Sequence, residues 1–578
     1  MSDTQRSTVA LSRPAPAPDA GPLDGQFYDL VETRFRRLLR ENPVLATYAG
    51  VHTEDDRLGD GNRDSVLQEI ADERAHLAAI EALDESGLSG DVRFERDLET
   101  HNVRRQLFDQ EVRRLWERRS TAMDTVGDAL FLLFARDFAP LPERLASIIG
   151  RLEAVPQFLT DSRTRAAVPQ VRLWQRLEID SASQLPGLFG EILNAARSEL
   201  HPPALKRLES AITAARGAID DYQAWLRDSL ASGTDDWALG RERYDELVGL
   251  RAFDGLDADA ILEIGWEQLA RNKEGRAAAA REIDPSLPEA EVIDRIKSDH
   301  PKTFADALDA YRDAMFRARQ HLIDHDIVTI PPGERISVIE TPEYLRNVVP
   351  FAAYFDPPKF DTNPSGIYIV TPSVDASAGA MREHNYSSIS NTSVHEAYPG
   401  HHLQLTWASR HPSLTRLTTD APEFVEGWGM YSEQMMREQG FDDAANFRLN
   451  VYTDAIWRAC RIILDIRMHR GEIGADEATA WMVEQTNFEA PNARAEVNRY
   501  TYTPTYQLSY LLGKVLILQL RADEQRRLGD AFSLRQFHDR LMENASLPIS
   551  FHRRLLGAQP GSKSRAGGGA GAADRAAR

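Results

Sequence analysis

The chain has 578 residues, of which 42% are hydrophobic and 27% charged, the balance of an ordinary soluble globular protein. Its net charge of -21 argues against nucleic acid or an anionic membrane surface as the main partner, because both require clustered positive charge. The single cysteine, Cys460, excludes an intrachain disulfide.

Both ends of the chain have low-complexity sequences. Residues 1–24 are rich in Ala and Pro, residues 558–578 are rich in Gly and Ala, and both segments are predicted to be disordered. No run of residues approaches the roughly 18 apolar residues of a membrane span, and no secretory leader is recognised. We therefore expect a cytoplasmic protein with no membrane segment.

Residues 25–240 are predicted to form an N-terminal helical lobe. Apolar residues recur at helical spacing around Val31 and Phe35, and the run 129–135 (ALFLLFA) is typical of a fully buried helix. This part contains no catalytic signature. We expect it to wall a deep cleft against a second lobe, residues 241–557, in a mainly α-helical fold.

Three short segments in the second lobe are rich in β-branched residues and are bounded by Pro or Gly. They are residues 326–332, 335–342 and 366–372, and we expect them to form a small sheet near the functional site. For the last of them, from Gly366 to Pro372, two interpretations stay open: an edge strand that offers its backbone to an extended peptide, or a purely structural strand.

The segment Asn391–Gln404 (NTSVHEAYPGHHLQ) carries the strongest chemical signal. A His-Glu pair followed by another His on a helix is how zinc hydrolases place two imidazoles on the metal, with the carboxylate as general base. His395 and Glu396 form such a pair, and His401 and His402 follow. The sequence therefore predicts a Zn²⁺ site.

The spacing requires a break in this helix, because Pro399 stands one turn after His395. Proline cannot donate the helical hydrogen bond, and Gly400 tolerates unusual backbone angles. On an unbroken helix His401 would lie about 240° from His395, whereas His402 would lie about 10 Å further along the axis. We therefore expect His395 and His401 as ligands, with His402 as the alternative.

A third ligand is expected from the segment FVEGWGMYSE. Glu426 lies there among apolar and aromatic residues, and a buried carboxylate is costly unless it is paired or bound to a metal. Glu423 and Glu433 lie near the same helical face and remain rivals. A surface glutamate at a helix start is the structural alternative.

Further candidates follow in the chain. Asp465 and His469 are four residues apart on one helix, which suits a proton-transfer pair or a structural hydrogen bond. Arg499, Tyr506 and Tyr510 could stabilise the oxyanion that forms when an amide is hydrolysed. A packed tyrosine stripe is the structural alternative.

The motifs HEAYPGHHLQ, EGWGMY and RYTYTPTYQLSYLLGK resemble the DUF885 family, whose members resemble helical zinc metallopeptidases of the gluzincin type. The likeness extends from FRRLLRENPVLATYAG at residues 35–50 to about residue 555. It implies His395, His401 and Glu426 as ligands, Glu396 as base and Tyr510 as the first choice for the oxyanion. Gly429 stands where this resemblance leads us to expect Ala.

Together these features predict a zinc-dependent hydrolase that cleaves peptide or small amide substrates. Two alternatives remain: a metal-dependent amidase of a small biosynthetic molecule, and a non-catalytic metal-binding protein of the same fold. A serine or cysteine hydrolase is disfavoured, because no G-x-S-x-G motif or placed Cys-His pair occurs.

Overall fold

The computed structural model describes residues 11, 13–15, 19–342, 346, 349, 351–361, 363–372 and 380–558. Most of the two tails that were predicted to be disordered lies outside these residues. In the described part of the N-terminal tail, Arg13 pairs with Asp29 and Glu32 of the first helix.

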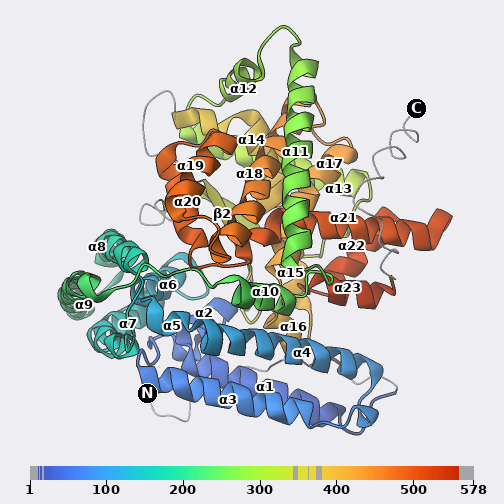
Figure 1. Cartoon of the computed structure of the whole chain (residues 1–578). Coiled ribbons are helices and arrows are strands. Elements are labelled where there is room, and N and C mark those ends of the chain that lie inside the picture. Colours follow the sequence, from blue (N-terminus) through green and yellow to red (C-terminus); the bar gives the residue numbers. More distant parts are fainter. Residues whose placement is uncertain are drawn as a thin grey trace.

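The N-terminal part of the chain is helical (Figure 1), as the sequence predicts. Phe27, Val31, Phe35 and Leu39 recur every fourth residue, so they share one helix face and enter a common core. A second core contains Ala129, Leu130 and Leu133 of the run at 129–135, and Phe134 packs against it. The helices are α1 Asp24–Glu41, α2 Pro43–Ala49, α3 Arg63–Glu81, α4 Gly90–Phe108, α5 Leu115–Arg118, α6 Ala122–Ala135, α7 Leu141–Ser162, α8 Arg172–Glu199 and α9 Pro202–Ser229.

The C-terminal part of the chain has one large core, which begins at Tyr244 and ends at Ala558. The long helix α11 packs along α18 in this core (Figure 1). Its helices are α10 Arg241–Leu250, α11 Ala258–Ile283, α12 Glu289–Lys297, α13 Phe304–Asp324, α14 Tyr386–Glu396, α15 His401–Arg410, α16 Leu414–Leu417, α17 Pro422–Glu438, α18 Ala445–His469, α19 Ala475–Thr486, α20 Ala490–Tyr500, α21 Ser509–Leu528, α22 Leu534–Glu543 and α23 Ile549–Leu556.

A three-stranded sheet completes the fold, so the prediction of a mainly α-helical protein with a small sheet is confirmed. Its strands are β1 Ile336–Glu340, β2 Ala352–Phe355 and β3 Gly366–Val370, in the order β1-β3-β2. β3 runs parallel to β1, with Ile336 opposite Gly366, and antiparallel to β2, with Ala352 opposite Val370.

Two predictions about this sheet are wrong. β3 is the central strand, so its backbone is paired on both sides and cannot accept a peptide as an edge strand would. Residues 326–332 form no strand, because side chains take up their backbone polar groups. Asp539 accepts from the Thr329 N–H at 2.7 Å, and His538 Nδ1 lies 2.9 Å from the Ile327 carbonyl oxygen.

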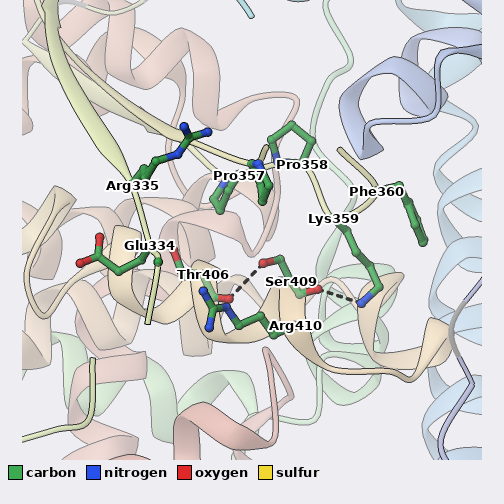
Figure 2. Close-up of a pocket in the computed structure, with 11 residues that line it drawn as sticks. Glu334, Arg335, Pro357, Pro358, Lys359, Phe360, Thr406, Ser409 and Arg410 are labelled. Carbon is green, nitrogen blue, oxygen red and sulfur yellow. Dashed lines mark hydrogen bonds between the residues drawn. The ribbon is translucent and has the colours of Figure 1, made fainter. Parts of the chain in front are cut away.

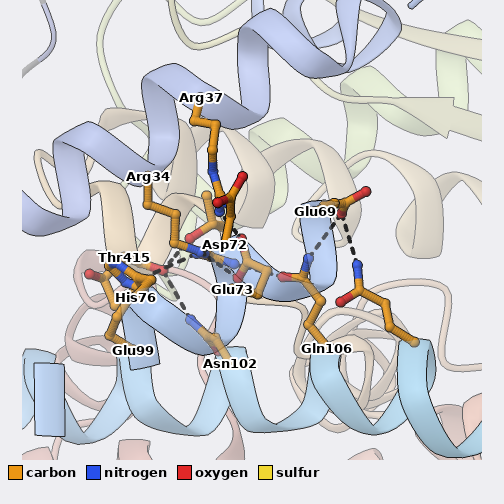
Figure 3. A network of polar contacts seen from close by, with 12 residues as sticks. Arg34, Arg37, Glu69, Asp72, Glu73, His76, Glu99, Asn102, Gln106 and Thr415 are labelled. Atoms are coloured by element: carbon orange, nitrogen blue, oxygen red, sulfur yellow. Dashed lines mark hydrogen bonds and ion pairs between the residues drawn. The ribbon is translucent and has the colours of Figure 1, made fainter. Parts of the chain in front are cut away.

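A buried polar network connects the N-terminal helices to the C-terminal part (Figure 3). Arg34 of α1 donates to Glu73 of α3 at 2.8 Å and to Glu99 of α4 at 3.2 Å. Asn102 of α4 donates to the Thr415 carbonyl oxygen of α16 at 3.3 Å. These contacts fix α4 against the segment that joins α15 to α17, the helices that carry two of the three predicted ligands, His401 and Glu426.

Within the described residues, the helices are each too short or too polar to cross a membrane.

Candidate metal centre

The chain breaks between α14 and α15, as the position of Pro399 predicts. α14 ends at Glu396, α15 begins at His401, and the Tyr398–Pro399 peptide bond is cis. The linker folds back so tightly that a Cβ on Gly400 would lie 1.8 Å from the His395 carbonyl oxygen. The Trp428 indole N–H donates to the Pro399 carbonyl oxygen at 2.7 Å and so fixes the break on α17.

Helix α17 brings Glu426 to the same place. Pro422 lies in the first turn of α17, where the missing N–H costs nothing. Gly427 faces Gly513 of α21, and a Cβ on Gly427 would lie 2.5 Å from the Gly513 carbonyl carbon. The two backbones can therefore approach closely, which holds α17 in a fixed position beside α21.

The side chains of three residues, which we call the metal group, converge: His395, His401 and Glu426. Each offers one ligand atom, and these atoms all lie within 4.8 Å of one another. The Glu426 carboxylate oxygen lies 3.7 Å from Nε2 of His395 and 3.4 Å from Nε2 of His401. Ligands at about 2.1 Å from a tetrahedral ion lie roughly 3.4 Å apart. The separations and the two-imidazole, one-carboxylate donor set therefore fit zinc.

The charges around these side chains also suit a cation. Burial alone would lower the pKa of His395, but contacts with Glu426 and Glu433 outweigh burial and raise that pKa to about 10. Burial alone would raise the pKa of Glu426, yet His395 and His401 hold it well below its usual range. A metal ion can take the place of the protons that these carboxylates attract.

A carboxylate and an amide behind His395 orient its ring. Glu433 Oε1 lies 2.7 Å from Nδ1 of His395, which turns Nε2 toward Glu426. Asn391 donates to Glu433 at 3.0 Å and to Asp454 at 2.8 Å. Such partners fix the tautomer and orientation of a metal-binding imidazole.

We expect Glu433→Gln to weaken zinc binding about 10- to 100-fold, because the neutral amide orients His395 less firmly and removes a negative charge. Competition with a chromogenic chelator measures this affinity. Glu438→Gln, on the same helix but paired with Arg521, is the control and should bind zinc as the parent protein does. Unchanged affinity in Glu433→Gln would show that this contact is not needed to position the ring.

The rival ligands are engaged elsewhere. Both ring nitrogens of His402 have partners, the Tyr354 hydroxyl at 2.8 Å and Glu334 at 2.9 Å. The Glu423 carboxylate pairs with Arg251 at 2.8 Å. Glu433 contacts His395 from the Nδ1 side, opposite the converging group. The structure therefore brings together the three residues that the sequence favours.

Gly429 lies directly against the first histidine of the group. A Cβ at this position would lie 2.7 Å from Cε1 and 2.8 Å from Nε2 of His395. An alanine, which the family resemblance leads us to expect, would displace the imidazole as it is placed in this chain. Glycine is therefore part of the geometry that directs Nε2 toward Glu426.

Gly429→Ala should lower zinc affinity by about tenfold or more, because the displaced ring no longer presents Nε2 to the other two ligands. Equilibrium dialysis against buffered zinc gives the affinity. Gly217→Ala in α9 is the matched control, since a Cβ there meets nothing within 4 Å. Equal zinc affinities for the two variants would contradict the argument.

Glu396, the predicted base, is the last residue of α14 and is half-buried. The negative charge of Glu396 acts on the neighbouring His395 and on two tyrosines, Tyr311 and Tyr368. Burial raises the pKa of both tyrosines above the usual range, and the charge of Glu396 adds to this effect. Glu396 thus acts through its charge on the first of the three converging residues.

The predicted oxyanion residues lie beside Glu426. The Tyr506 hydroxyl donates to Glu426 Oε1 at 2.8 Å. The Tyr510 ring packs edge-on against Tyr506 with centroids 5.8 Å apart, and the Arg499 guanidinium lies 5.9 Å from the Tyr506 ring. Tyr506 therefore contacts Glu426 directly, and the other two residues pack on Tyr506.

His469 lies outside this group. Its Nε2 contacts the Tyr500 carbonyl oxygen at 2.9 Å, and its ring stacks on Tyr244. Asp465, its expected partner, instead accepts from the Tyr244 hydroxyl and the Thr505 N–H. The pair thus makes separate structural contacts, and burial lowers the pKa of His469 to about 4.

A cavity of about 1210 Å³ reaches the metal group. It is lined by Glu426 and Tyr506 together with Arg34, Tyr48 and Trp116 of the N-terminal helices. A substrate in this cavity would therefore contact both parts of the chain. A smaller cavity of about 450 Å³ lies beside α15 and is lined by Glu334, Lys359 and Arg410 among others (Figure 2).

Several residues of the site were not assigned from the sequence. Glu433 was considered only as a rival ligand, and Asn391 and Arg461 were not considered. The signal for two of them is helical spacing: Asn391 lies one turn before His395, and Glu433 two turns after Glu426. No local pattern marks Arg461, which lies 4.5 Å from the Tyr510 ring and pairs at 2.8 Å with Glu496, two residues that are distant from it in the chain.

Comparison with known proteins places the chain among proteins without an assigned activity. A family model described as a bacterial protein of unknown function, DUF885, matches residues 43–556. A candidate lipoprotein of unknown function from Shewanella oneidensis has a similar structure, with a TM-score of 0.75, 22% identity, and coverage of 92% of this chain and 99% of the other. A candidate lipoprotein from Colwellia psychrerythraea also has a similar structure, with a TM-score of 0.80, 17% identity, and coverage of 92% of this chain and 98% of the other. No curated protein matches in sequence.

Proposed function

The chain belongs to the DUF885 family, and we propose that it is a zinc-dependent hydrolase of peptide or related amide bonds, of the gluzincin type. The observation that carries this proposal is the convergence of His395, His401 and Glu426 within 4.8 Å. Glu396, a potential base, follows the first of these residues directly in the chain. A zinc site that only stabilised a fold would need a fourth protein ligand rather than a base.

Zinc held by these side chains would polarise an amide carbonyl and lower the pKa of a bound water toward about 7. Glu396 accepts the proton of the attacking water and delivers it to the leaving nitrogen. Tyr510 donates a hydrogen bond to the carbonyl oxygen as negative charge develops on it. Tyr506 holds the Glu426 carboxylate through its hydroxyl.

A chelator-sensitive activity screen tests this proposal. The zinc-loaded protein is incubated with a peptide library and, in parallel, with acyl-amino-acid amides. Hydrolysis that stops with a chelator and returns with zinc supports the proposal, and the preferred library separates a peptidase from a small-molecule amidase. A protein that binds zinc but hydrolyses neither library would be the non-catalytic alternative.

The cytoplasmic location stays a prediction. The two solved relatives are described as candidate lipoproteins, so a location outside the cytoplasm is the alternative for this chain. Fractionation of the native cells with an antibody to the protein distinguishes the two locations.

A further inference from the structure

Three arginines stack on aromatic rings beside the metal group, and we refer to Arg458, Arg461 and Arg499 as the arginine cluster. The Arg461 guanidinium lies 4.5 Å from the Tyr510 ring and 4.1 Å from the Trp457 ring. Arg458 lies 3.9 Å from the Trp457 ring and 5.9 Å from Tyr510. Two of the three arginines therefore lie over the tyrosine to which we assign the oxyanion, and Arg499 lies 5.9 Å from the neighbouring Tyr506 ring.

Ion pairs join the three guanidiniums of the cluster to two carboxylates. Arg461 and Arg499 share one carboxylate, Glu496, at 2.8 and 3.3 Å. Arg458 makes a long contact of 3.4 Å with Asp454. Two carboxylates thus face three guanidiniums. Glu433 also acts on Arg458 but is hydrogen-bonded to His395.

Three buried donors in this cluster have no hydrogen-bond partner among the residues that the structure describes. They are Nη1 of Arg461, Nε of Arg458 and Nε1 of Trp457. Arg461 is only 3% exposed, so its unpartnered donor is costly to bury. A bound ligand is one way to satisfy buried donors of this kind, and a guanidinium matches a carboxylate bidentately.

The cluster lies within two side chains of the metal group. Tyr506 bonds Glu426 at 2.8 Å, Tyr510 packs on Tyr506 at 5.8 Å, and Arg461 lies over Tyr510. In a peptide, the C-terminal carboxylate carbon is at most roughly 4 Å from the carbonyl carbon of the last amide bond. A carboxylate held by the cluster would therefore place that last amide bond beside Tyr510, the residue to which we assign the oxyanion.

We propose that Arg458, Arg461 and Arg499 form a subsite for the free C-terminal carboxylate of the substrate. This inference depends on the proposed function, which it narrows to peptides and N-acyl amino acids cleaved at the final amide bond. The same positive charge disfavours the N-terminal ammonium group that an aminopeptidase would hold next to the metal.

The test compares acetylated dipeptides that have a free C-terminal carboxylate with the same molecules carrying a C-terminal carboxamide. The parent protein should cleave the acid with a kcat/KM at least about tenfold higher. Arg461→Gln should lose most of this preference by raising KM for the acid alone, and Arg461→Lys should retain part of it. Equal cleavage of acid and amide by the parent protein would overturn the inference and leave the proposed function standing.

Arg521→Gln is the matched control, because Arg521 also pairs with a glutamate and lies over a tyrosine, at 2.9 Å from Glu438 and 5.5 Å from the Tyr431 ring. It should keep the preference for the acid. If Arg461→Gln does not fold, Arg458→Gln, whose ion pair is weaker, carries the same expectation. If every folded variant of the arginine cluster still prefers the acid over the amide as strongly as the parent protein, the subsite is contradicted.

A binding measurement separates this inference from the activity. Calorimetry with zinc-loaded Glu396→Gln compares the affinities of the acid and the amide in the absence of turnover. Tighter binding of the acid supports the subsite even if the protein hydrolyses neither molecule, in which case only the proposed function fails. Equal affinities overturn the subsite whatever the activity.

Discussion

Glu396→Gln should retain zinc and lose turnover by roughly 10²- to 10⁴-fold, the usual contribution of a positioned general base. Glutamine keeps the size and polarity of the side chain but cannot accept the proton of the attacking water. Because Glu396 lies outside the three converging ligands, its replacement leaves their donor atoms unchanged. The loss should therefore appear in kcat rather than in zinc content.

The control for this variant is Glu543→Gln, since Glu543 is also the last residue of its helix, α22, but lies outside the metal group. It should hydrolyse substrate at the parental rate. Parental turnover in Glu396→Gln, measured with the first substrate that the library screen identifies, would remove Glu396 from the mechanism. Loss of zinc together with turnover would instead place Glu396 among the residues that bind the metal.

His395→Ala should release zinc, with an affinity loss of more than about 100-fold. Replacement of an outer partner of a zinc ligand already costs about 10- to 100-fold, and His395 is expected to be a ligand itself. The variant also leaves the buried Glu433 without its histidine contact and the half-buried Glu426 with one imidazole neighbour, so both carboxylates lose a partner for their negative charge. Zinc content and activity should fall together.

His402→Ala is the control for this prediction, because it removes a nearby histidine whose ring nitrogens already contact Tyr354 and Glu334. Provided that circular dichroism shows this variant to be folded, it should keep zinc. A His402→Ala variant that loses zinc, beside a His395→Ala variant that keeps it, would reverse the ligand assignment.

Local sequence patterns predicted those parts of the fold and site that depend on neighbouring residues. Pro399 and Gly400 indicated the break between α14 and α15, because proline lacks a helical donor and a side chain at 400 would collide with the preceding turn. The buried run in α6 likewise follows from its apolar sequence alone. Both features are properties of a few consecutive residues.

Features that depend on distant segments could not be predicted in this way. Thr329 lies in an apolar, β-branched segment, but Asp539, some 210 residues later, takes up its backbone N–H. Strand order likewise depends on where β2 packs, and its short AAYF sequence gives little β signal. The arginine cluster was missed for the same reason, since Arg461 meets Glu496 and Tyr510 only in the folded chain.

The same distinction explains why the sequence left rival ligands open. On sequence alone, His402 and Glu423 matched the required chemistry almost as well as the favoured residues. Each proved to have its own partner, Glu334 and Arg251 respectively, on a segment far away in the chain. Competition for partners, rather than residue type, decides which side chains remain directed toward the metal group.

The most direct measurement is the metal content of the purified protein by inductively coupled plasma mass spectrometry, after dialysis against buffer with trace zinc. The proposed site predicts about one zinc ion per chain in the parent protein and in Glu396→Gln, and almost none in His395→Ala. A parent protein that holds no zinc under these conditions, or a His395→Ala variant that holds as much as the parent, would contradict it.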